Sequence, residues 1–452
     1  MSWRILFFGK DRNKNRYKIY GPASTCLRLQ KHGFMLSLGI DIGSSSIKVA
    51  VYDHAKGITL GTGQYPEQEM KILSLKEGWA EQEPEWWWDA FLKAFQQLKN
   101  KYKFDLSAVR SIGIAYQMHG LVCLDKAGNT VRPSIIWCDS RAVPYGQEAL
   151  EALGEQYAFS HLLNSPGNFT AAKLAWVKDQ EPALFEKIDK VCLPGDYLAY
   201  RLTGELTTTI SGLSEGIFFD FERQEVSAEL LAHFGFSESI LPTVKPSFAK
   251  HGTIKAQLAQ TLGLSPAAEV TYKAGDQPNN ALSLNVLQPG EIAATAGTSG
   301  VVYGVSDQLF IDETQRVNSF AHVNYTPDSS RIGVLLCING TGIANSWAQQ
   351  WTGAKSYTAM NELVSNIPPG SEGLSFWPFG NGAERMLGNA NPGSQLKGLQ
   401  FNWHKPAHLY RAVQEGIAYS FLYGMEAFTE NGMDLQVIRA GHANMFLSQP
   451  FV

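Results

Sequence analysis

The chain has 452 residues, of which 44% are hydrophobic and 18% charged. This composition is typical of a globular protein with a large core, and it excludes disordered, collagen-like and coiled-coil chains. The length predicts an enzyme of two or three domains. The 38 basic and 42 acidic residues give a net charge of −4, without the basic excess of a nucleic-acid-binding surface, so we expect no nucleic-acid partner.

Neither a membrane segment nor a cysteine motif is found in the sequence. No run reaches the roughly 18 apolar residues that a transmembrane helix requires. The five cysteines lack the spacing of metal or redox motifs. The sequence therefore predicts a reduced, cytoplasmic protein with no membrane partner.

The first 34 residues differ from the rest of the chain. They contain eight basic residues and one acidic residue, a net charge of +7. The short apolar run 5–8 precedes most of these basic residues, whereas in a secretory signal it would follow them. Met35 opens a strand-like run and is a candidate functional start. We interpret residues 1–34 as a basic extension that is disordered or not native; a nucleotide- or partner-binding arm is the alternative.

A regular pattern of elements begins at Met35. Three β-rich runs separated by turn residues predict an antiparallel meander over residues 36–40, 47–52 and 59–65. A helix follows, because Pro84 is placed for a first helical turn and apolar residues recur at steps of three and four from Trp88 to Leu98. After it come a buried strand, 109–116, and a hairpin of residues 121–124 and 134–137.

The rest of the chain mixes helical and strand patterns. Apolar periodicity predicts helices over residues 170–180, 194–202 and 409–425. Short β-rich runs predict strands over residues 270–274, 291–296, 301–303 and 332–338.

Two turns rich in Gly, Ser and Thr occur in matching strand–turn–strand contexts, about a domain apart. They are Asp41 to Ser46 and Ala296 to Gly300. Small residues let backbone N–H groups approach a phosphate, hydroxyls add donors, and an Asp can hold Mg²⁺. Either turn alone is better explained as an ordinary tight hairpin, but the matching pair favours nucleotide binding.

Two further polar residues follow predicted strands. Asp276, on a Gly turn, is placed to accept a proton from a hydroxyl that attacks a phosphate; a solvated Gly-Asp turn is the alternative. His119, in the run 117–120, is either a substrate contact or a structural histidine at a strand end.

Three motifs in this order resemble the FGGY carbohydrate kinases: residues 38–43, 275–277 and 297–300. Residues 173–180 resemble most of one family signature, although Asn168 departs from it, and residues 398–416 resemble the second. The resemblance implies an α/β fold of two actin-like (ribonuclease H-like, Hsp70/actin ATPase) domains with a cleft between them. Residues 35–283 would form the sugar-binding domain and residues 284–452 the nucleotide-binding domain.

Within this family, residues 117–120 and 132–137 are similar to the xylulokinase branch, whose Met-His pair contacts a ketopentose. The resemblance implies phosphorylation of D-xylulose by ATP to D-xylulose 5-phosphate, with the sugar as small-molecule partner, and it allows a homodimer. A kinase for another ketose or polyol is one alternative. An actin-like ATPase or sugar sensor without productive transfer is the other.

The resemblance also assigns roles to individual residues. Asp276 would be the catalytic base and Asp41 the organiser of Mg²⁺, through water. The sugar would be bound by Gln117, Met118, His119 and Gln277. ATP and its phosphates would be bound by Gly43, Ser44, Ser45, Ser46, Gly297, Thr298, Ser299, Gly340, Thr341, Gly441 and Asn444. His442 and Ala443 replace the more usual glycine-rich sequence at the last of these motifs.

The resemblance also bears on the C-terminal end. FGGY kinases usually continue from residues 441–444 into a helix, a strand and a closing helix, whereas this chain stops at Val452. We therefore expect a truncated second domain with exposed apolar surface, poor solubility and weak or absent activity.

Overall fold

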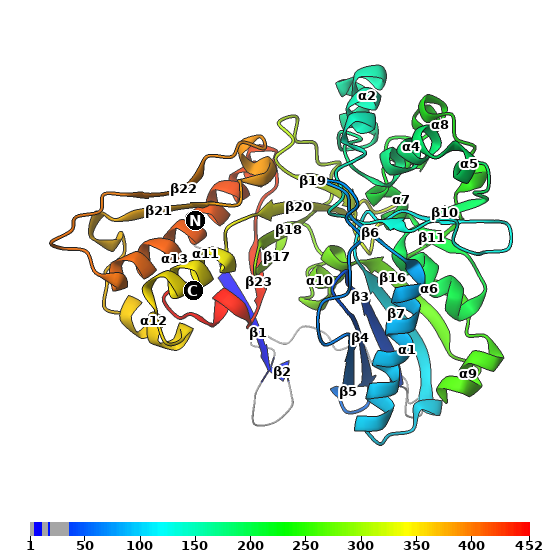
Figure 1. Ribbon diagram of the computed structural model, residues 1–452, viewed down its shortest axis with the longest axis horizontal. Helices are drawn as coiled ribbons and strands as arrows, with labels where there is room; N and C mark the ends of the chain where they lie inside the picture. The colour runs from blue at the N-terminus through cyan, green and yellow to red at the C-terminus, as the bar shows by residue number, and fades with distance from the viewer. Residues whose placement is uncertain (1–3, 11–16, 19–35) are drawn as a thin grey trace. The chain divides into compact units, whose positions relative to one another are not determined.

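The computed structural model describes residues 4–10, 17–18 and 36–452 (Figure 1). These residues divide into two compact units. The first unit holds residues 36–279 and Phe320–Ser330, and the second holds Asn280–Ser319 and Arg331–Val452. The sequence predicted a domain boundary at residue 283. It did not predict that Phe320–Ser330, later in the chain, packs with the first unit.

The first unit is built on a six-stranded mixed sheet with the order β15-β16-β7-β3-β4-β5. Its strands are β3 (Leu36–Ile42), β4 (Ile47–Asp53), β5 (Ile58–Tyr65), β7 (Val109–Tyr116), β15 (Phe248–Thr253) and β16 (Glu269–Gly275). The predicted meander β3-β4-β5 is confirmed, and β7 pairs in parallel with both β3 and β16. The carboxyl ends of these three parallel strands therefore meet at one edge of the sheet.

Helix α1 (Pro84–Lys101) covers part of this sheet. It begins at Pro84, as predicted, and lies along β4 and β5 (Figure 1). Its buried face includes Trp87, Phe91, Phe95 and Leu98, which pack with alternate residues of the strands into one apolar core. Burial of this stripe, rather than helix propensity, holds α1 on the sheet.

The remaining elements of the first unit are short. Its helices are α2 (Val143–Leu153), α3 (Glu155–His161), α4 (Thr170–Gln180), α5 (Pro182–Phe185), α6 (Pro194–Thr203), α7 (Ile210–Glu215), α8 (Ala228–Phe234) and α9 (Ala256–Leu262), and α10 (Asp276–Ser283) follows β16. Its short strands are β6 (Glu81–Gln82), β8 (Val122–Leu124), β9 (Ser134–Ile135), β10 (Lys190–Cys192), β11 (Thr207–Thr209), β12 (Phe219–Asp220), β13 (Glu225–Val226) and β14 (Thr243–Lys245). The predicted helices over 170–180 and 194–202 are confirmed as α4 and α6.

The predicted hairpin over residues 121–137 is wrong as a regular ladder. Strand β8 pairs with β10 and strand β9 with β6, so a single isolated bridge, Leu121 to Ile135, joins the two predicted arms. Pro133 lacks the N–H that a continuous ladder needs beside β9. Partners distant in sequence supply the missing hydrogen bonds instead.

The second unit contains a seven-stranded sheet with the order β19-β20-β18-β17-β23-β1-β2. Its strands are β17 (Glu291–Ala296), β18 (Gly300–Ser306), β19 (Asn318–Ala321), β20 (Ile332–Ile338) and β23 (Val437–Gly441), with β1 (Arg4–Lys10) and β2 (Tyr17–Lys18) at the edge. Strands β17, β18 and β20, all predicted from the sequence, are antiparallel neighbours. Strand β23 pairs in parallel with β17.

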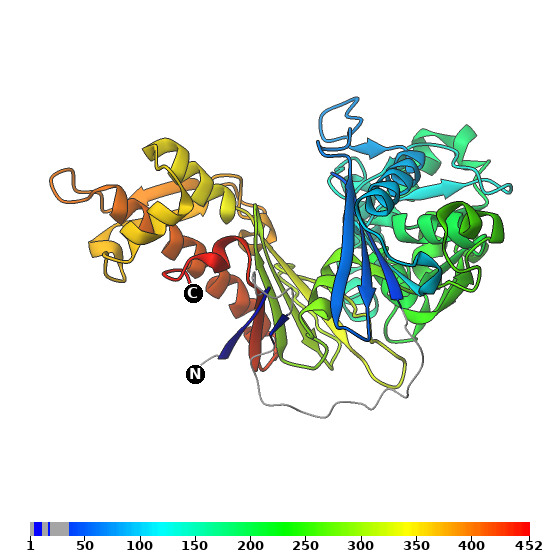
Figure 2. The same cartoon turned by 90° about the horizontal axis from the view of Figure 1, so that it is seen from below.

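Helices and a separate hairpin complete the second unit. The helices are α11 (Gly342–Thr352), α12 (Tyr357–Val364) and α13 (Pro406–Glu430), and the hairpin is β21 (Ser375–Phe379) with β22 (Gly393–Lys397). The predicted helix over 409–425 is confirmed but is longer at both ends. Helix α13 packs between β21 and the sheet strands β18 and β20. Figure 2 shows α13 as the orange helix beside the yellow-green strands.

The N-terminal segment differs in part from the expectation of disorder. Residues Arg4–Lys10 form β1, which pairs in parallel with β23 along Val437–Gly441. Without β1, strand β23 would be the edge of the sheet, and its N–H and C=O groups on that side would be unpaired. Such an edge readily adds another strand, and the run 5–8 is apolar and β-prone. Residues 1–3, 11–16 and 19–35 lie outside the described residues, and so does that part of the prediction. Within the described ranges, no helix has the length and apolar character needed to span a bilayer.

Candidate active site

Three candidate segments of the first unit leave the sheet side by side. Ile42, Tyr116 and Gly275 are register partners across β3, β7 and β16. The next residue of each strand therefore begins a loop at the same edge, and the N–H of Gln117 donates to the carbonyl of Ile42 across 2.7 Å. Parallel pairing thus brings the segments that begin at Gly43, Gln117 and Asp276 together, although they are far apart in sequence.

Asp276 lies at the start of α10 and is partly buried. Burial and the nearby Asp41 carboxylate raise the pKa of Asp276 to about 7, although hydrogen bonds from Gln277 lower it. A carboxyl group of this pKa exchanges a proton readily near neutral pH, which suits a general base. Gln277, a predicted sugar-binding residue, therefore lies against the carboxylate of Asp276.

Asp41 lies at the end of β3, where its side chain is 42% exposed and pairs with the ammonium of Lys48 at 3.3 Å. Carboxylates suit Mg²⁺, which typically binds one or two of them and completes its shell with water and substrate phosphate oxygens. Across residues 36–452, no cluster of three or more His, Cys, Asp or Glu side chains forms a dedicated metal cage. Asp41 fits a Mg²⁺ ion held mainly through water and phosphate.

The turn Gly43–Ser46 is fixed from both sides. The N–H of Gly43 donates to the carbonyl of Ser46 at 3.1 Å, and the side chain of Gln82 donates to the carbonyl of Ser44 at 2.7 Å. Ser45 is exposed, whereas Ser46 is buried and its hydroxyl accepts from Gln64. The open side of the turn therefore presents Ser44 and Ser45 rather than Ser46.

The predicted sugar residues follow β7 directly. Met118 is buried beside Gly275, and His119 is half-buried, with its ring against Phe169 and Phe320 at centroid distances of 4.9 and 5.4 Å. Gln117 is buried, and its amide donates to Gln82 at 3.3 Å. Gln117 thus faces the interior and supports the turn that carries His119.

Sequence reasoning missed three polar residues of this region. Gln82 bridges Ser44, Gln117 and Trp87. Lys173 and Glu215 are fully buried, and both hydrogen-bond to His119. Lys173 lay inside a signature run without an assigned role, and Glu215 carried no motif. The only signal for Lys173 was its place within the apolar run Ala171 to Val177, and the sequence held no signal for Glu215.

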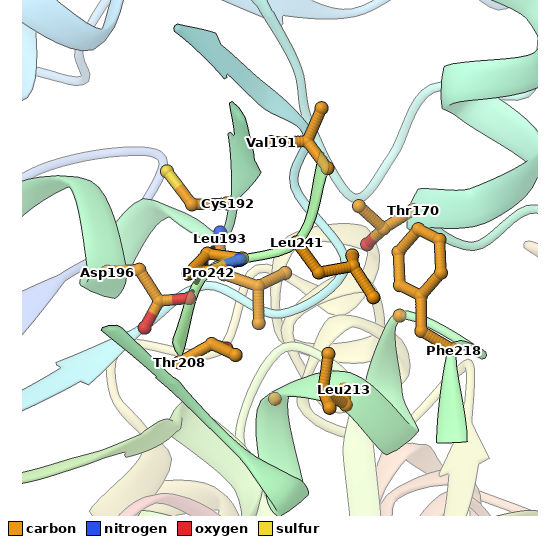
Figure 3. Close-up of a pocket in the computed structure, with 12 residues that line it drawn as sticks. Thr170, Val191, Cys192, Leu193, Asp196, Thr208, Leu213, Phe218, Leu241 and Pro242 are labelled. Atoms are coloured by element: carbon orange, nitrogen blue, oxygen red, sulfur yellow. Dashed lines mark hydrogen bonds between the residues drawn. The ribbon is translucent and has the colours of Figure 1, made fainter. Parts of the chain in front are cut away.

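Figure 3 shows a small cavity of the first unit, lined by residues of α4, α6 and α7 among others. It has a volume of about 20 Å³, with Asp196 at one end and Thr170 and Phe218 at the other (Figure 3). The hydroxyl of Thr170 has no partner among the described residues. A space of this size holds one water molecule and excludes a sugar.

The second unit brings its own predicted residues together. The hydroxyl of Thr341 donates to the carbonyls of Gly297 and Thr298 at 2.9 and 3.1 Å, which ties the start of α11 to the β17-β18 turn. Thr298 and Ser299 remain exposed at the tip of that turn. A Cβ built on Gly297 would lie 3.4 Å from the side-chain nitrogen of Asn444, and Gly441 ends β23 in the same sheet.

A cavity of about 600 Å³ adjoins Gly340 in this unit. Its walls include Ile343 and Trp347 of α11, and Phe376 and Pro378 of β21. An apolar, aromatic cavity of this volume suits a planar base better than a phosphate.

Comparison with known proteins places the chain in a family. The model of the FGGY family of carbohydrate kinases, N-terminal domain, matches residues 36–283. The chain belongs to the FGGY carbohydrate kinases. The family membership and the two-domain actin-like fold predicted from the sequence are therefore confirmed.

Individual FGGY relatives are similar over most of the chain. A xylulose kinase from Klebsiella pneumoniae is 32% identical over 395 residues, which are 86% of this chain and 78% of that protein. A xylulose kinase from Escherichia coli is 30% identical over 89% of this chain and 80% of its own length. A crystal structure of a xyloylose kinase from Brucella ovis is 28% identical, with a TM-score of 0.82 over 92% of this chain and 83% of that one.

Proposed function

We propose that this FGGY kinase transfers the γ-phosphoryl group of ATP to D-xylulose, giving D-xylulose 5-phosphate and ADP. The names of the relatives support the substrate, since several at 28–32% identity are xylulose kinases. The observation that carries the chemistry is Asp276, whose pKa is raised to about 7 at the edge shared by the Asp41 and His119 segments.

In this reaction the accepting hydroxyl of the sugar loses its proton to a carboxylate oxygen of Asp276. The hydroxyl oxygen forms a bond to the γ-phosphorus of ATP, the bond from that phosphorus to its bridging oxygen breaks, and ADP leaves. His119 and Met118 bind the sugar, and the rings of Phe169 and Phe320 keep water from one side of His119. This alignment lowers the barrier mainly through proximity.

Asp41 would hold Mg²⁺. When bound, this ion neutralises charge on the phosphates. In the first unit, Ser44 and Ser45 present donors for phosphate oxygens. In the second unit, the Thr298 turn supplies further donors, and the cavity beside Gly340 receives the nucleoside. A cytoplasmic location and a homodimer remain part of the proposal.

The test is a coupled ADP-release assay across pentuloses, hexuloses and polyols with the 452-residue chain. We expect D-xylulose to give the highest kcat/KM and to stimulate ADP release well above the sugar-free rate. A higher kcat/KM for a polyol such as glycerol would favour the alternative of another kinase of this family. Release of ADP that no sugar stimulates would support an ATPase or sensor.

A further inference from the structure

His119 has an unusual backbone. Its φ of 60° lies in the left-handed region, which a residue with a Cβ rarely adopts. Such conformations persist only where the surroundings hold them, and they cluster at functional sites. The structure must therefore contain groups that stabilise His119 in this conformation.

Two buried residues supply these groups. The N–H of His119 donates to Oε1 of Glu215 at 3.3 Å, and the ammonium of Lys173 donates to the carbonyl of His119 at 2.8 Å. Nδ1 of the His119 ring lies 3.0 Å from the backbone carbonyl of Glu215. Because a carbonyl only accepts, Nδ1 must carry the proton, so the neutral ring has its lone pair on Nε2.

The carboxyl group of Glu215 is placed beside the predicted base. Its Oε2 is buried without a hydrogen-bond partner among the described residues and would lie 2.7 Å from a Cβ built on Gly275, the residue before Asp276. Burial raises the pKa of Glu215 well above its usual range, and the carboxylates of Asp276 and Asp196 raise it further. The N–H of His119 and the charge of Lys173 act in the opposite direction. Burial therefore favours the protonated form of Glu215.

We propose that Glu215 is a positioning residue of the sugar site, whose side-chain and backbone oxygens fix His119 in the left-handed, Nδ1-protonated form that meets the sugar. The proposal rests on the assignment of His119 to sugar binding. Oε1 of Glu215 accepts from the N–H of His119, and the raised pKa of Glu215 disfavours a second negative charge beside Asp276. Lys173 fixes the carbonyl of the same residue, because its ammonium donates to the carbonyl oxygen of His119.

Two substitutions separate the hydrogen bond from the volume of the side chain. Glu215→Gln keeps an accepting Oε1, whereas Glu215→Leu fills similar space and leaves the N–H of His119 unpaired. We expect Glu215→Leu to raise the KM for xylulose about tenfold and Glu215→Gln to change it less than about threefold, with the KM for ATP within about twofold in both. Asp220→Asn is the matched control, because this buried carboxylate holds a different histidine, His161, in the same unit.

A second measurement needs no sugar. The ¹⁵N chemical shifts of His119 in the full chain report which ring nitrogen carries the proton, and we expect the Nδ1-protonated form in the wild type and in Glu215→Gln. A wild-type ring protonated on Nε2 alone would overturn the proposal, even if Glu215→Leu failed to fold. So would a Glu215→Leu protein whose xylulose KM is unchanged although His119→Ala raises it, or a Glu215→Leu protein with equal losses for xylulose and ATP.

His119→Ala distinguishes this proposal from the proposed function. If His119→Ala raises the xylulose KM but Glu215→Leu does not, the positioning role is wrong and the sugar assignment stands. If neither change affects the xylulose KM while the ¹⁵N shifts show the expected tautomer, Glu215 still positions His119, but the ring does not bind xylulose and the sugar-site proposal is wrong.

Discussion

The ammonium of Lys273 donates to the Oδ1 of Asp196 across 2.5 Å, and both side chains are buried. The pair joins β16, three residues before Asp276, to the first turn of α6. Lys273 also donates to the carbonyl of Thr207 at 2.5 Å. This ion pair fixes the end of the strand from which the predicted base projects.

Lys273→Met should destabilise the first unit strongly, because it leaves the Asp196 carboxylate buried without its cation. We expect a loss of about 3–5 kcal/mol in unfolding free energy, measured by urea denaturation. The double change Lys273→Met with Asp196→Leu should recover part of this loss. Lys250→Met is the control, since its pair with Glu269 is exposed and should cost under about 1 kcal/mol. Similar losses for both lysines would contradict the role of the buried pair.

Asp276→Asn should abolish most sugar phosphorylation while nucleotide binding stays near normal. The change removes the proton acceptor but keeps the size of the side chain, so we expect kcat to fall about 10²–10⁴-fold. Steady-state kinetics and ADP affinity measure the two effects. Asp89→Asn, an exposed change on α1, is the control. Near-normal turnover of Asp276→Asn would refute its assignment as base.

The pH profile should show the ionisation of Asp276. A general base acts when ionised, so the ionisation of Asp276 taken alone should make kcat/KM rise about tenfold per pH unit below the pKa of about 7 and level above it. Burial lowers the pKa of Lys173 to about 7 as well, but its loss of charge would weaken sugar binding as pH rises. Ionisation of Asp276 should therefore raise kcat/KM as pH increases, and loss of charge from Lys173 should lower it at higher pH. A kcat/KM that does not change from pH 5 to 9 would contradict the assignment of Asp276.

His119→Ala should raise the KM for the sugar more than the KM for ATP. The change removes the ring that packs between Phe169 and Phe320 but leaves the turn Gly43–Ser46 and the second unit intact. We expect about a tenfold selective effect in steady-state kinetics. Equal increases in both KM values would count against the sugar pocket.

Gly340→Ala should weaken nucleotide binding. Gly340 has a φ of 81°, and a Cβ there would lie 1.6 Å from the carbonyl oxygen of Pro378, beside the cavity of the second unit. The matched control is Gly353→Ala, which has a φ of 70° but no atom within 4 Å of the added Cβ. We expect the control to cost about 1–2 kcal/mol of unfolding free energy with ADP affinity preserved, and Gly340→Ala to cost more and to lower ADP affinity. Equal effects would show that backbone conformation, not the contact with Pro378, matters.

The sequence alone determined the family and many of the longer elements of secondary structure. Apolar alternation located β3, β4 and β7, and Pro84 with its apolar stripe located α1, because burial of one face and local backbone preferences are both readable from residue spacing. Ordered motifs such as Asp41–Ser46 and Gly275–Gln277 identified a carbohydrate kinase before any contact was known.

Only the tertiary structure decided which distant residues meet. Parallel pairing of β3, β7 and β16 brings Gly43, Gln117 and Asp276 to one edge, and the order of strands in a sheet is not encoded in local spacing. The same applies to Glu215, whose effect on His119 depends on burial and on a contact 96 residues apart in the chain. Burial, proximity and charge state are properties of the folded arrangement, so no single motif could reveal them.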